Sequence, residues 1–235
     1  MWQHLTDAVG EQQALFDREI QAWIDRYTRG GGTIFCGKGC FNCCTLAVNC
    51  TFPEALRVSL SLSSLQAERV RDHAARLMDR MHEVADLKSY LRIHRQEIGS
   101  CPFLDEGGSC GIYGERPFSC RALISTRENY WCGLDFSTLS SEEKRDFVES
   151  LDREVVSFPL HYVAETQDRG QVLEKGVAEE MTRRFGLSLY GDLPYLVHLE
   201  REHRLSSIIP LGYEITMSFL DQNSLLNPFL VIPDR

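Results

Sequence analysis

The first thirty residues carry apolar positions at the spacing of a helix. Between positions 11 and 29 they lie mostly three or four residues apart, at Phe16, Ile20, Trp23, Ile24 and Tyr27. One face of a helix would therefore be apolar. Three glycines at positions 30–32 follow and predict its end. We interpret these glycines as a linker, because a phosphate-binding loop would follow a strand and end in GK[ST].

The segment from 51 to 98 predicts two helices that form a hairpin. Thr51 and Glu54 make a capping-box pattern around Pro53, which indicates a helix start. From about Ser64 one apolar stripe continues along a second, long helix, at Val70, Ala74, Leu77, Met81, Val84 and Leu91. We expect the histidines of that helix to be surface or helix-interface residues; they are His73, His82 and His94.

Residues 99–135 lose this periodicity and are rich in Gly, Pro and Cys, which indicates loops with one helical turn near 116–123. Helices resume after a capping box at Ser140 and Glu143, continue over about 171–185 to Gly186, and begin again near Asp192.

The sequence thus predicts a mainly α fold. Antiparallel helices return the chain to its start, so a hairpin of about 50 residues would bring two cysteine-rich loop regions together around a metal site. We expect a small helical cysteine-cluster domain at 1–135. A helical C-terminal extension at 136–235 would pack on it, either as a separate unit or as part of one continuous domain.

Charge narrows the choice of partner. The formal net charge is −9, and residues 136–235 carry 10 Lys and Arg against 17 Asp and Glu. Nucleic acid is excluded, because phosphate binding needs a basic face. Neither a secretory signal nor a membrane-length apolar run is visible. We expect a cytoplasmic protein without a membrane partner that binds another protein; the sequence does not specify the oligomeric state.

The nine cysteines are confined to one part of the chain, and none follows position 132. In a reducing compartment such confinement indicates metal ligands rather than disulfides or scattered core residues. If Cys50 is set aside as a buried or spare thiol, two groups of four remain as candidate metal ligands: Cys36, Cys40, Cys43 and Cys44, then Cys101, Cys110, Cys120 and Cys132.

Eight thiols could supply two tetrathiolate sites, of zinc or of [4Fe-4S] type. The spacings match neither a zinc ribbon nor a ferredoxin, and we favour an iron–sulfur cluster, with zinc as the alternative. Side chains of neighbours in an extended backbone point to opposite sides, so we expect Cys43 and Cys44 to face different ligand sets.

Four thiolates around zinc or an oxidised [4Fe-4S] core leave about two negative charges, which nearby cations and N–H groups stabilise. Lys38, Arg116, Arg121 and Arg127 offer positive charge beside the cysteines. We expect Arg116 and Arg121 to stabilise the cluster or to form structural ion pairs, and Tyr113 to pack beside the site.

The segments "CGKGCFNCC", "TFPEAL" and "CPFLDEGGSCGIYGERPFSCR" resemble the YkgJ-like cysteine cluster family, a zinc- or iron-chelating domain of CxxCxxCC type. The resemblance covers about residues 35–132. It departs from the family pattern in the first gap, where three residues rather than two separate Cys36 from Cys40, and in the additional Cys50.

The resemblance implies metal or iron–sulfur binding. Flagellin lysine N-methylases are similar in their cysteine segments, which would imply S-adenosylmethionine-dependent protein modification. This chain lacks a glycine-rich signature for that cofactor, so whether it is an enzyme stays open. Two hypotheses follow: an iron–sulfur protein that supports redox or protein-modification chemistry, and a non-catalytic, zinc-stabilised protein-interaction module.

Overall fold

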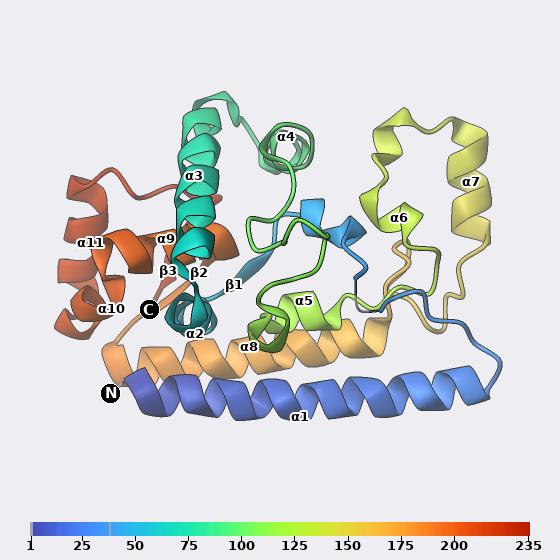
Figure 1. Cartoon of the computed structure of the whole chain (residues 1–235), viewed down its shortest axis with the longest axis horizontal. Helices are drawn as coiled ribbons and strands as arrows, with labels where there is room; N and C mark the ends of the chain where they lie inside the picture. Colours follow the sequence, from blue (N-terminus) through green and yellow to red (C-terminus); the bar gives the residue numbers. More distant parts are fainter. Residues whose placement is uncertain (1, 38) are drawn as a thin grey trace.

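The computed structural model describes residues 2–37 and 39–235. Two long helices, α1 (Trp2–Arg29) and α8 (Ala164–Phe185), lie side by side along one edge of the molecule (Figure 1). α1 begins well before the predicted position 11. The two helices share a buried apolar cluster that includes Val9, Phe16, Ile20 and Val177.

A small antiparallel sheet joins the segment before α2 (Phe52–Ser61) to two segments of the C-terminal part of the chain. Its strands are β1 (Asn49–Thr51), β2 (Ser188–Asp192) and β3 (Val231–Asp234), in the order β1-β2-β3. Cys50 of β1 faces Gly191 of β2. The sequence predicted no strand, because three to five residues are too few to show an alternating pattern.

The predicted long second helix is wrong, because the chain turns before Asp86. Asp86 caps a new helix, with its Oδ1 accepting a hydrogen bond from the Ser89 N–H at 2.7 Å. Tyr90 and Ile93 are buried, whereas Leu91 is 46% exposed. The segment consists of α2 (Phe52–Ser61), α3 (Ser64–Arg80), a 3₁₀ turn (Met81–Glu83), α4 (Leu87–Ile93) and a π-helical turn (His94–Ile98).

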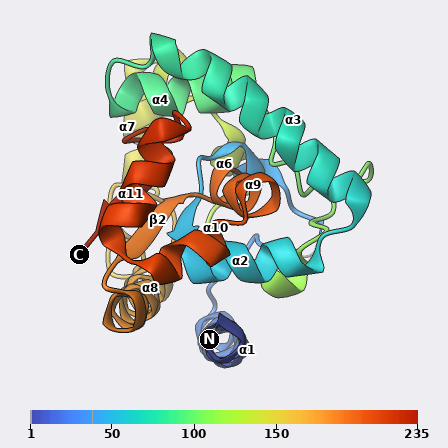
Figure 2. The ribbon, with the colours of Figure 1, turned by 90° about the vertical axis from the view of Figure 1, so that its left-hand side faces the viewer.

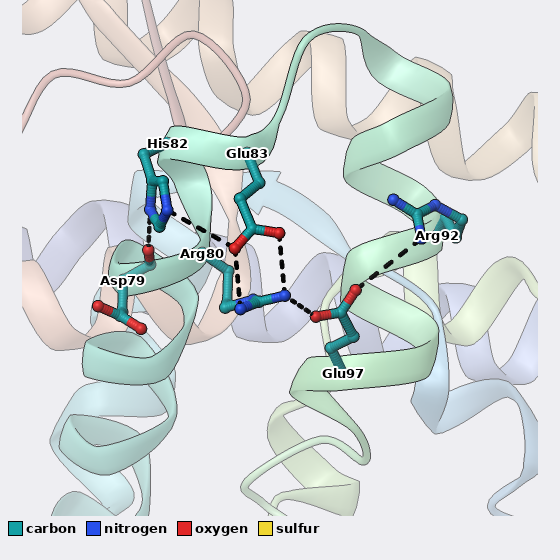
Figure 3. A network of polar contacts seen from close by, with 6 residues as sticks. All are labelled: Asp79, Arg80, His82, Glu83, Arg92 and Glu97. Atoms are coloured by element: carbon teal, nitrogen blue, oxygen red, sulfur yellow. Dashed lines mark hydrogen bonds and ion pairs between the residues drawn. The ribbon is translucent and has the colours of Figure 1, made fainter.

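Ion pairs join the two sides of this turn (Figure 3). Arg80, at the end of α3, pairs with Glu83 at 2.9 Å and with Glu97 of the π-helical turn. Glu97 also lies 4.0 Å from Arg92. Partly exposed pairs of this kind contribute little stability individually, so we assign them the role of fixing the direction of the turn.

Helix α9 (Leu193–His203) occupies the centre of the core, with α2 and α3 packed beside it (Figure 2). Tyr195, Leu196, Val197 and Leu199 are fully buried there. The remaining helices are α5 (Phe118–Ala122), α6 (Tyr130–Gly133), α7 (Ser141–Glu149), α10 (Leu205–Ile208) and α11 (Tyr213–Gln222).

This architecture confirms the mainly α prediction. One apolar cluster draws on residues from both sides of position 135, including Phe52, Leu77, Leu196 and Leu230. The division at 135 stays a prediction. Within the described residues, no helix has both the length and the apolar character that a bilayer crossing requires.

Gly191 provides a test of the sheet. A Cβ atom at this position would lie 2.1 Å from the Leu230 carbonyl oxygen, which is backbone and cannot rotate away. We expect Gly191→Ala to lower the free energy of unfolding by about 1–3 kcal/mol, measured by chemical denaturation.

Gly176→Ala is the matched control, because Gly176 lies within α8 and a Cβ there would meet open space. It should raise stability by up to about 1 kcal/mol through helix propensity. Equal effects of the two substitutions would contradict the assigned packing of β2 against β3.

Candidate metal centre

The two cysteine-rich loops lie directly against each other, as the sequence predicted. The Cys101 N–H donates a hydrogen bond to the Cys44 carbonyl at 2.8 Å. The Ser119 hydroxyl donates to the Asn49 carbonyl at 2.7 Å. These contacts bring the two groups of thiols to one region of the molecule.

Seven of the eight candidate cysteines line one cavity of about 530 Å³, which we call the thiol cavity. Cys132 lines a second cavity instead. Cys50 is fully buried in the core and lines neither cavity, and its exclusion from the ligand set stays a prediction. The thiols of the first cavity are Cys36, Cys40, Cys43, Cys44, Cys101, Cys110 and Cys120.

Cys43 and Cys44 do not point in opposite directions. They belong to a 3₁₀ turn, Asn42–Thr45, rather than to an extended segment, and both line the thiol cavity. Their hydrogen bond to each other is the largest cause that raises the pKa of the Cys43 thiol, ahead of burial. The extended backbone assumed for this pair is therefore wrong, and the assignment of Cys43 and Cys44 to different ligand sets stays a prediction.

All nine cysteines are free thiols. Burial raises the pKa of Cys36 to about 11, although the Ser125 N–H, 3.1 Å from its sulfur, opposes that rise. Burial is likewise the largest cause that raises the pKa values of Cys101 and Cys120. Without a metal these thiols are therefore protonated at neutral pH, and metal binding would release protons.

Neighbouring thiolates also raise these pKa values, and the cysteines that act on one another fall into two spatial groups. Cys101 and Cys120 interact with each other and with Cys110, and both Cys110 and Cys120 interact with Cys43. Cys36 and Cys132 interact with Cys40 and Cys43. Cys43 therefore lies between the two spatial groups, and each group combines cysteines from both loops.

Arg116 is the cation that acts on the thiols. At Cys43 the hydrogen bond with Cys44 is the largest effect and raises the pKa, and at Cys110 and Cys120 burial is the largest effect and raises it. The charge of Arg116 acts in the opposite direction and lowers the pKa of all three thiols. The guanidinium stacks 3.6 Å from the centre of the Tyr113 ring, which is half exposed. Arg116 and Tyr113 thus lie together beside the thiols.

Arg121 has a different set of partners. It is 2% exposed, pairs with Asp17 of α1, and donates to the carbonyls of Arg116 at 2.7 Å and Gly114 at 2.5 Å. Although it also lines the thiol cavity, these contacts favour the structural ion pair. Arg127 lies 3.8 Å from its neighbour Glu128. The predicted contribution of Lys38 lies outside the described residues.

His161 is a nitrogen donor that sequence reasoning missed. Its Nε2 lies 3.3 Å from the Cys132 sulfur, and both residues are buried. Burial lowers the pKa of His161 to about 4, so the ring is neutral, as a metal ligand must be. No motif spacing links position 161 to the cysteines, and only the folded chain shows the pair.

Two further histidines line the thiol cavity. His73 and His94 are 0% and 3% exposed, not surface residues, with ring centres 6.0 Å apart. The His94 Nε2 lies 3.6 Å from Oδ2 of the buried Asp192. Within the described chain the ring nitrogens and this oxygen make no hydrogen bonds. Oxygen and nitrogen donors thus accompany the thiols.

The donor set fits a soft metal, because thiolates favour zinc and iron–sulfur clusters. As the side chains lie, no three Cys, His, Asp or Glu residues within 2–37 and 39–235 are positioned to hold one metal ion. Metal binding would thus require the thiols to draw together. The first loop is suited to this, because residues 32–41 contain no regular helix or strand among those described.

Residues 35–143 match the family model described as "CxxCxxCC: Putative zinc- or iron-chelating domain". The match includes all eight candidate ligands and confirms the resemblance to this domain type. No curated protein and no solved structure matches the chain.

Arg121 tests which part of this region is structural. Arg121→Met should lower the free energy of unfolding by about 2–4 kcal/mol, because two loop carbonyls and the Asp17 carboxylate lose their donor. Denaturant titration of the purified protein measures this loss. Arg201→Met, at an exposed position, should change stability little; a loss of similar size there would contradict the assigned role.

Proposed function

We propose that this chain, which carries a CxxCxxCC domain over residues 35–143, binds a [4Fe-4S] cluster through its grouped cysteines. The observation that carries the proposal is the gathering of seven thiols around one cavity. Four thiolates suffice for such a cluster or for one zinc ion, and the chain offers two groups. When bound, the cluster would supply one-electron redox chemistry.

The spatial group formed by Cys43 and three cysteines of the second loop supports the proposal most strongly. Cys110 and Cys120 interact with Cys43, Cys101 interacts with Cys110 and Cys120, and Arg116 lowers the pKa values of Cys43, Cys110 and Cys120. A nearby guanidinium offsets the negative charge that four thiolates leave on a cluster. The second group, Cys36, Cys40, Cys44 and Cys132, would form a further site together with His161.

The chain's own residues would also protect such a cluster. The Ser125 N–H already points at the Cys36 sulfur, as amides do around sulfur ligands. Tyr113 stacks on Arg116 and restrains its position. We propose that the redox unit works in the cytoplasm and acts on or with another protein, consistent with the acidic region from 136 to 235.

The alternative is a zinc-stabilised module that binds a protein without catalysis. It uses the same thiols, and the observation that favours it is the separation of the donors. Because they must draw together, a metal would fold the first loop, as structural zinc does. Under this alternative, removal of zinc by a chelator lowers the melting temperature and abolishes partner binding.

Metal and sulfide content distinguish the two proposals. Anaerobically purified protein should contain about four iron atoms and four sulfides for each occupied site, with visible absorption that bleaches in air. Colourless protein containing zinc and no sulfide would overturn the iron–sulfur assignment and support the alternative.

Cysteine variants test the ligands. Cys120→Ser and Cys44→Ser should each lower the metal content of the protein, because each removes one thiol from the thiol cavity. Cys50→Ala is the matched control, because Cys50 is buried in the core and outside that cavity. Metal content unchanged by Cys120→Ser, or lost in Cys50→Ala, would contradict the ligand assignment.

A further inference from the structure

A second cavity of about 840 Å³ lies beside the thiol cavity. Cys132 and His161 of the proposed metal sites line one part of it, and the proposed metal sites do not account for the rest of its lining. Its volume is within the range of small-molecule binding sites. We call it the α8 cavity, because α8 contributes one wall. Most of its lining is apolar or aromatic, including Val48, Leu123, Trp131, Leu134, Phe136 and Phe147.

One part of the α8 cavity is polar and contains acceptors without donors. Glu174 of α8 and Asn49 of β1 both line it. Their Oε1 and Oδ1 atoms are fully shielded from solvent, and among the described residues neither has a hydrogen-bond partner. A buried acceptor left unpaired costs about 1–3 kcal/mol, so a ligand that donates hydrogen bonds here would recover that energy.

The surrounding charges favour a cationic donor. Glu174 forms no ion pair with any described residue. The two cations that line the cavity are accounted for: Arg95 donates to the Leu134 carbonyl at 2.5 Å, and Lys144 is exposed on α7. Burial, and then the charge of Glu54, raise the pKa of Glu174 to about 8, partly opposed by hydrogen bonds from Ser119 and Tyr190.

Glu54 cannot accept the same ligand. Its carboxylate is fully buried and already receives hydrogen bonds from Thr51 N, Thr51 Oγ1 and Phe118 N, at 2.9, 2.7 and 2.8 Å. Of the two neighbouring carboxylates, Glu174 is therefore the one that faces the cavity with an unpaired oxygen.

We propose that the α8 cavity binds a small organic molecule with an ammonium group on an apolar body. On binding, the Glu174 carboxyl releases its proton to solvent, the ammonium donates hydrogen bonds to Glu174 Oε1 and Asn49 Oδ1, and the apolar part packs among Trp131, Phe136 and Phe147. Aromatic rings also attract cations at short range, which adds to the preference for an amine. This binding does not depend on which metal the thiols hold.

The test uses two probes of the same shape, n-hexylamine and 1-hexanol, titrated into the full-length protein by calorimetry at neutral pH. We expect hexylamine to bind at least tenfold more tightly than hexanol, and Glu174→Gln to abolish that preference. Glu179→Gln is the matched control, because this exposed residue of α8 does not line the cavity; it should retain the preference.

A second variant guards against a folding defect in Glu174→Gln. Gln171 lines the α8 cavity from an exposed position on α8, so Gln171→Trp should fold and obstruct the cavity. It should weaken the binding of both probes at least tenfold. The proposal is overturned if neither probe binds the wild-type protein, if both bind equally, if the preference survives Glu174→Gln, or if Gln171→Trp changes nothing.

Discussion

The arrangement of both cavities depends on one buried carboxylate. Glu54, fully inaccessible to solvent, accepts hydrogen bonds from Thr51, which follows Cys50, and from Phe118, which precedes Cys120 by two residues. Burial raises the pKa of Glu54, and these three hydrogen bonds and then the charge of Arg121 oppose that rise. A buried charge is tolerated only when its acceptors are satisfied. Glu54 therefore holds the start of α2 against the start of α5, and this contact places the two cysteine loops next to each other.

The parts of the fold that could be predicted are those set by local chemistry. The capping boxes at Thr51 and Ser140 begin helices where expected, and Gly186 ends α8 in the left-handed conformation. The contact between the loops followed from topology, because antiparallel helices return the chain to its origin. The turn before Asp86 was not predicted. The apolar stripe alone continues through this region, and it indicates neither that Asp86 caps a new helix nor that Tyr90 packs into the core.

Residues of the site that depend on tertiary packing could not be predicted. His161 reaches Cys132 only because the segment before α8 folds over α6, and Asp192 reaches His94 only because β2 pairs with β1. A histidine pattern on a helix gives its face, not whether another element covers that face. The candidate cysteines could be picked out because a metal site needs several residues of one type, and the type and number of residues can be read directly from a sequence.

The two cavities are neighbours that share a wall. Leu46, Val48 and Leu123 line both, and Cys132 lines the α8 cavity while acting electrostatically on Cys36 of the other. An occupant of the α8 cavity would therefore lie beside the second group of thiols.

Native proteins satisfy almost all buried polar groups, so unpaired ones in a site need a reason. Here such groups line both cavities: His73 and His94 in one, Asn49 and Glu174 in the other. A ligand in each cavity would supply the partners that these four residues lack, and the two ligands would then be separated only by the wall that Leu46, Val48 and Leu123 form.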